Sequence, residues 1–172
     1  MSAKSRGSYC DIDDIITDSQ NLTFMLEDTF GEVFGEELSA DLKMPPTEQH
    51  FVAPLWLGVG MAREELVTVV RPKEFQMSTL LDVQTDTRTS PKEQCGHVHY
   101  YEVAEKLSTL AEFHDLPLRM RQVFAARFGD VLLKSHAWGS QLNVEFFKSL
   151  VHLEMILFML NEASNRYFPV IH

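Results

Sequence analysis

The residues best suited to chemistry in this sequence are Cys95, His97 and His99, in the pattern C-x-H-x-H. A thiolate and two imidazoles are zinc ligands, but the spacing differs from the usual C-x₂₋₄-C and H-x₃₋₅-H pairs. A fourth ligand or a water molecule would be needed, and the sequence holds no second Cys/His cluster that could supply the ligand. The simpler interpretation is a helix entry whose histidines form hydrogen bonds or face solvent. A small zinc-dependent enzyme centred on these three residues is the alternative.

Other catalytic patterns are weak. Cys10 lies among aspartates, which disfavour the reactive thiolate. Those aspartates lack the glycine and the twelfth-position glutamate of a calcium-binding EF-hand loop. Gly58 and Gly60 lack the lysine and the spacing of a phosphate-binding loop. We therefore predict no catalytic residues, no cofactor and no resident metal. The aspartates are Asp11, Asp13, Asp14 and Asp18, on a short turn or helix that we expect Ile12, Ile15 and Ile16 to anchor.

The composition excludes several classes of protein. With 172 residues, 45% apolar and 23% charged, the chain is typical of a globular protein of one domain or two small ones. A formal charge of −10 argues against strong direct DNA binding by the chain alone, because such binding needs a basic surface. The basic residues Arg119, Arg121, Arg127 and Lys134 scatter around a helix. Two cysteines and a start without a secretory signal favour a reducing, intracellular compartment.

The last long helix organises the chain. It is predicted over residues 144–160, and its second half is apolar around almost the whole circumference. Such a helix is buried in a large core, a membrane or a subunit interface. The unbroken apolar run is shorter than the roughly 20 residues that cross a bilayer, so we expect no membrane span. A chain of this length can rarely enclose a terminal helix, which leaves burial against another chain.

The order of the other elements predicts an α+β fold. Strands are expected at residues 22–26, 48–52 and 66–70. Pro54 opens a short helix that we expect to end near Gly58 or Gly60. A small β-rich domain, residues 1–71, should therefore precede a mainly helical domain, residues 72–172. Helices are predicted over residues 72–83, 98–110 and 118–133. A further short helix is predicted to start with a capping box formed by Ser90, Pro91 and Glu93 and to end at Gly96.

Several of these segments, in the same order, resemble the Psf-three subunit family of the eukaryotic GINS DNA replication complex. Residues 9–15 resemble the family's opening segment Y-x-D-I-D-D-[IVL], and residues 54–57 its P-L-W-L helix. The strand at residues 66–70, with the following P-K-E-F, is similar to its strand and next helix start. Residues 99–101 match its H-[FY]-[FY] position, and the helix at residues 124–133 takes the place of its central amphipathic helix.

This resemblance implies a GINS-like subunit without catalysis of its own. Its partners would be the three other GINS subunits, in a nuclear heterotetramer. That tetramer joins the minichromosome-maintenance helicase ring and its RecJ-like co-activator. From the excess of apolar residues in the chain itself, we expect the interface to include Trp56, Leu107, Phe124, Phe128, Phe147, Leu150, Met155 and Phe158.

Overall fold

The structure is a computed structural model that describes residues 11–26, 50–86, 90–96, 98–136 and 141–167. The chain divides into two compact units. The N-terminal unit comprises residues 1–72 and 109–112, and the helical unit comprises residues 73–108 and 113–172. A small antiparallel sheet lies in the first unit and the second is built of helices, so the predicted α+β class is confirmed.

The sheet of the N-terminal unit has β1 (Asn21–Leu26) at its centre. β2 (His50–Pro54) pairs antiparallel with one edge of β1, and β3 (Val67–Val69) pairs with the other. Side chains alternate between buried and exposed along β1, and Phe24, opposite Phe51 and Val69, is fully buried. This period of two is what the sequence showed, and the strands predicted near residues 22–26 and 66–70 are confirmed.

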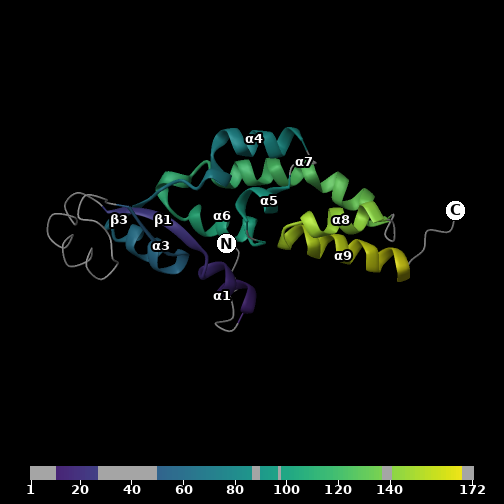
Figure 1. The fold of residues 1–172 in the computed structure, drawn as a ribbon, viewed down its shortest axis with the longest axis horizontal. Coiled ribbons are helices and arrows are strands. Elements are labelled where there is room, and N and C mark those ends of the chain that lie inside the picture. Colours follow the sequence, from purple (N-terminus) through teal and green to yellow (C-terminus); the bar gives the residue numbers. More distant parts are fainter. Residues whose placement is uncertain (1–10, 27–49, 87–89, 97, 137–140, 168–172) are drawn as a thin grey trace, which may run out of the picture. The chain divides into compact units, whose positions relative to one another are not determined.

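Helix α3 (Leu55–Arg63) packs against this sheet and begins directly after Pro54 (Figure 1). The prediction that it ends near Gly58 or Gly60 is wrong, because the helix continues through both glycines. Gly58 serves packing instead of termination. A Cβ atom at this position would overlap the ring of Phe24, so only glycine allows α3 and β1 to approach this closely.

Helix α1 (Ile12–Asp18) precedes the sheet. The carboxylate of Asp11 caps it by accepting a hydrogen bond of 3.1 Å from the backbone N–H of Asp13. The expectation that the isoleucines anchor this helix is wrong: Ile12, Ile15 and Ile16 are 71%, 56% and 41% exposed. The buried residue is Thr17, whose hydroxyl donates to the carbonyl of Asp13.

The longest helix of the helical unit is α7 (Leu116–His136), which contacts α4 (Met77–Thr85), α6 (Tyr100–Leu107) and α9 (His152–Tyr167). Figure 1 shows α7 running beside α4. Within the described ranges, no helix is long and apolar enough to cross a membrane. The remaining elements are the 3₁₀ turns η1 (Lys73–Phe75) and η2 (Ala111–Phe113), and the helices α5 (Pro91–Cys95) and α8 (Gln141–Ser149).

The helix predicted over residues 144–160 is in fact two helices, α8 and α9. The chain turns at Leu150 and Val151, which are both fully buried. No glycine or proline marks this break. Side chains from an earlier part of the chain instead bind the last carbonyls of α8 and so satisfy its end. The ammonium of Lys92 donates to the carbonyl of Lys148 at 2.7 Å.

Ser90 also contributes to this break. It stands at the N-cap position of α5, but its side chain makes no capping bond, so the predicted capping box is wrong. Its hydroxyl instead donates to the carbonyl of Ser149, at the end of α8. The predicted end of α5 at Gly96 is confirmed, since Gly96 adopts the left-handed conformation, with φ of 72°.

Candidate functional site

Helix α9 is held to α7 by a buried ion pair. The guanidinium of Arg127 donates to both carboxylate oxygens of Glu154, with N–O distances of 2.6 and 3.1 Å. The two residues are 2% and 0% exposed. A bidentate pair of this kind is strongly directional, and the pairing offsets the cost of removing both charges from water. The pair therefore fixes which face of α9 is turned toward α7.

The hydroxyl of Tyr101 completes this polar centre by donating to Glu154 Oε1 at 3.1 Å. Burial, and then the negative charge of Glu154, raise the pKa of Tyr101 far above its ordinary value. The phenol therefore remains a neutral donor to the carboxylate throughout the physiological pH range.

Further polar contacts continue along the inner face of α9. The side-chain amide of Asn161 donates to the hydroxyl of Ser135 and, at 3.4 Å, to the carbonyl of Leu132, both on α7. Phe158 lies between Glu154 and Asn161 along this face and packs in an apolar cluster with Val131. The inner face of α9 thus combines a charge, an amide and one large aromatic side chain.

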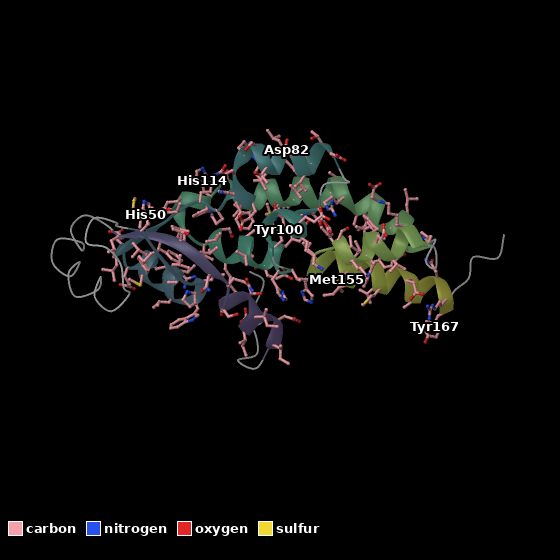
Figure 2. The ribbon with its side chains drawn as sticks, in the orientation of Figure 1. His50, Asp82, Tyr100, His114, Met155 and Tyr167 are labelled. Atoms are coloured by element: carbon pink, nitrogen blue, oxygen red, sulfur yellow. The ribbon has the colours of Figure 1, made fainter. Side chains whose placement is uncertain are left out.

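The outer face of α9 carries large apolar side chains. Leu153, Ile156, Met159, Leu160 and Tyr167 are 41%, 41%, 55%, 65% and 80% exposed. At 3.6 residues per turn these five positions fall within an arc of about 120°, which we call the outer stripe. Figure 2 shows the last of them, Tyr167, at the C-terminal end of the helix.

Helix α9 is consequently inverted with respect to a normal surface helix, which turns its apolar stripe inward and its polar residues to solvent. A contiguous exposed apolar patch is the usual mark of a binding surface. The outer stripe is therefore the best candidate interaction surface of the helical unit.

The residues expected at an interface occupy three different environments. Leu107, Leu150 and Phe158 lie inside the helical unit, with exposures of 0%, 0% and 2%. Phe124, Phe147 and Met155 are half-buried. Trp56 and Phe128 are 60% and 40% exposed and are therefore accessible in the chain by itself. Whether any of these residues contacts a partner stays a prediction.

Phe128 ends a series of aromatic contacts that begins in the interior. The ring of Tyr101 packs edge-on against Phe124, with 5.7 Å between centroids, and Phe124 lies 5.8 Å from Phe128. The rings of Phe124 and Phe128 are tilted by 55° to each other, so the partly exposed ring of Phe128 rests on an aromatic ring that is itself held edge-on by Tyr101. This is the arrangement expected of an anchor residue at an interface.

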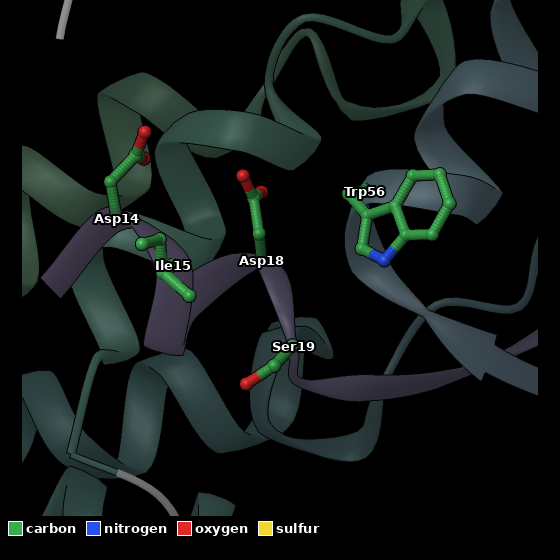
Figure 3. Close-up of a pocket in the computed structure, with 5 residues that line it drawn as sticks. All are labelled: Asp14, Ile15, Asp18, Ser19 and Trp56. Atoms are coloured by element: carbon green, nitrogen blue, oxygen red, sulfur yellow. The ribbon is translucent and has the colours of Figure 1, made fainter. Parts of the chain in front are cut away.

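Trp56 belongs to an open pocket in the N-terminal unit. The pocket has a volume of about 470 Å³ and lies between α1 and α3. Figure 3 shows Trp56 on one side and Asp14, Ile15, Asp18 and Ser19 of the α1 segment on the other. The pocket is thus lined by an indole and an isoleucine together with two carboxylates, and Figure 3 shows Asp18 between Ile15 and Trp56.

Most of the C-x-H-x-H pattern, on which the alternative of a zinc-dependent enzyme rests, lies outside what the structure describes. His97 and the side chain of Cys95 are not among the described groups, whereas His99 is. His99 is 6% exposed, and its ring lies 4.8 Å from that of His152, measured between centroids. The histidine that the structure does describe is therefore buried beside a second histidine from a distant part of the sequence.

No protein-family model matches the chain. The chain is 27% identical over 173 residues to the DNA replication complex GINS protein psf3 of Aspergillus fumigatus. The alignment covers 92% of this chain and 93% of that protein. The chain is similar to GINS protein psf3 over nearly its whole length. The resemblance predicted from the short segments is thereby confirmed, and the likeness extends over both units of the chain.

Proposed function

We propose that the chain is a non-catalytic structural subunit of a GINS heterotetramer. In this role it binds three other GINS subunits and contributes to the replicative helicase assembly, with the minichromosome-maintenance ring and its RecJ-like co-activator, in the nucleus. The name of the related protein supports the assignment to a GINS complex in DNA replication. The observation that carries the structural role is the inverted polarity of α9, with Glu154 inside and the outer stripe outside.

The energetics of the outer stripe support a binding role. Full burial of a large apolar side chain is worth about 1.5–3 kcal/mol. The five stripe residues are between two-fifths and four-fifths exposed, so covering them would contribute on the order of 5 kcal/mol. Association itself costs a comparable amount. A permanent complex therefore needs more contact area, to which we assign Phe128 and Trp56 as further exposed anchors.

The buried members of the predicted interface support the outer stripe by holding α9 in position. Leu150 and Phe158 pack with Val131 and hold α9 in place, and Met155 lies partly over this cluster. Replacing any of them would weaken binding indirectly, through the position of α9. Variants that separate folding from binding must therefore be made in the outer stripe.

The test is co-expression of the chain with the three other GINS subunits, followed by measurement of mass by light scattering. The wild-type chain is expected in a complex with one copy of each subunit. Leu160→Asp, at a position 65% exposed, should retain the helical content of the wild-type chain but lose one or more partners. Leu118→Asp is the matched control, because Leu118 lies on another helix of the same unit and is 60% exposed.

Two results would contradict the proposal at different levels. A wild-type chain that ignores all three subunits removes the GINS assignment. A Leu160→Asp chain that assembles as well as the wild type leaves the assignment standing but removes the outer stripe from the interface.

A further inference from the structure

A second feature of the helical unit is a cluster of His99, Glu102 and His152. His99 is the residue before α6, Glu102 lies in the first turn of α6, and His152 is the first residue of α9. The backbone N–H of His152 donates to the carbonyl of Val98 at 2.9 Å, which joins the start of α9 to the residue before His99. Backbone structure therefore brings together three side chains from segments about 50 residues apart.

The distances within the cluster centre on one carboxylate oxygen. Glu102 Oε1 lies 2.8 Å from Nδ1 of His152 and 3.9 Å from Nδ1 of His99. The first distance is a hydrogen bond, and the second is too long for one. A ring nitrogen of His99 and one of His152 lie within 4.8 Å of each other. Two imidazoles and one carboxylate, which are groups that bind metals in proteins, thus lie next to one another.

Two polar atoms of this cluster have no hydrogen-bond partner among the described residues, although both are buried: Nδ1 of His99 and Oε2 of Glu102. A buried polar group without a partner costs free energy, and nearly all such groups in folded proteins are satisfied by protein, water or an ion. His99 is 6% exposed, so bulk solvent does not readily satisfy its nitrogen. An ion bound between these atoms would satisfy both.

We propose that His99, Glu102 and His152 bind one Zn²⁺ ion. Zinc is bound by His nitrogen at about 2.0–2.1 Å and by carboxylate oxygen at about 2.0–2.2 Å, so neighbouring ligand atoms of a tetrahedral site lie about 3.3 Å apart. The observed distances of 2.8 and 3.9 Å lie on either side of that value. Side-chain rotations would have to bring these atoms to that spacing, together with the ring nitrogens of His99 and His152, which lie within 4.8 Å of each other.

Two histidines and one glutamate form a ligand set that zinc uses where one coordination position is left to water. The exposure of the side chains agrees with this, because Glu102 is 28% and His152 is 23% exposed, whereas His99 is 7% exposed. The ion would join the start of α6 to the start of α9 and so fix the end of the helix that carries the outer stripe. The site does not depend on assembly with other GINS subunits.

The decisive experiment is a zinc titration of the full chain by calorimetry after removal of metal with a chelator. We expect one Zn²⁺ per chain. The variants His152→Ala and Glu102→Gln should each lower the affinity more than about tenfold, as loss of a metal ligand does. His136→Ala is the matched control: His136 is an exposed residue of α7, and its replacement should leave zinc binding unchanged. Circular dichroism of each variant establishes that it is folded.

Cobalt replaces zinc as an optical probe and distinguishes thiolate ligands from nitrogen and oxygen ligands. Co²⁺ held by nitrogen and oxygen shows visible absorption typical of tetrahedral coordination, without a thiolate charge-transfer band. That spectrum, together with unchanged binding by Cys95→Ser, supports the proposal. A wild-type chain that binds no zinc stoichiometrically overturns it. A thiolate band, or loss of binding in Cys95→Ser with full binding in His152→Ala, overturns it in favour of the C-x-H-x-H site.

Discussion

Replacing Arg127 with methionine removes one half of the buried ion pair and nearly preserves the volume of the side chain. The carboxylate of Glu154, which is 0% exposed, then keeps the hydroxyl of Tyr101 and loses both guanidinium hydrogen bonds. Leaving one member of a buried pair without the other costs about 3–5 kcal/mol. In a chain of 172 residues we expect the melting temperature to fall by roughly 6–20 °C.

The double variant Arg127→Met/Glu154→Leu should recover most of this loss. Both charges are then absent, and apolar side chains of similar size fill the space between α7 and α9. Such replacements are often neutral or stabilising, so we expect the double variant to lie within about 2 kcal/mol of the wild type. Adding Tyr101→Phe removes the hydroxyl that would otherwise have lost its acceptor.

Urea unfolding followed by circular dichroism measures the free energy of unfolding of each variant, and the wild type, the two single variants and the double variant form a double-mutant cycle. Arg121→Met is the matched control. Arg121 is exposed on the same helix, so its replacement should change stability by less than about 0.5 kcal/mol. If Arg127→Met behaved like Arg121→Met, or if the two single costs simply added, the pair would not hold α9 as we infer.

Two further predictions concern Tyr101 and Gly58. The pKa of Tyr101 is raised in the folded chain, whereas in the unfolded chain it has the ordinary value of 10.0. Above pH 10 the unfolded chain therefore loses the phenol proton while the folded chain keeps it. The free energy of unfolding should be unaffected below pH 10 and should fall above it. Urea unfolding at pH 8–11 should show a shallower alkaline loss for Tyr101→Phe but not for the exposed Tyr167→Phe, and equal slopes would contradict the assignment. Gly58→Ala should destabilise by about 1–3 kcal/mol through overlap with Phe24, despite alanine's higher helix propensity. Gly60→Ala should stabilise by up to about 1 kcal/mol, because a Cβ there meets no described atom within 4 Å; a stable Gly58→Ala chain would refute the close packing.

The sheet could be predicted because its signals are local. β1 alternates apolar and polar residues, and the β-branched run around Val67–Val69 stops before Pro72. These two strands therefore followed from propensity and periodicity. The end of α3 could not be predicted from local signals, because Gly58 serves packing and does not end the helix. The break in the C-terminal helix at Leu150 could not be predicted either, because it depends on side chains about 56 residues away.

The candidate surface was only partly predictable for a similar reason. The sequence showed too many apolar residues in the last helix for one chain to bury, but it could not show which of them face outward. That orientation is set by Arg127 and Glu154, a pair 27 residues apart. Arg127 was interpreted as one of several scattered basic residues, since a charged residue on a helix is usually exposed. The signal that was available is the polar spacing of Glu154, Asn161 and Asn165, which marks one side of α9.

The inverted polarity of α9 has a consequence for the lifetime of the chain in the cell. If the proposed partner does not cover Leu153, Ile156, Met159 and Leu160, these side chains remain an exposed apolar surface of the kind that chaperones and degradation machinery recognise. We expect copies made in excess of their partners to be removed, and the amount that persists to follow the supply of those partners. A helix that buries an ion pair and exposes large apolar side chains would in this way couple the abundance of one chain to that of its proposed partners.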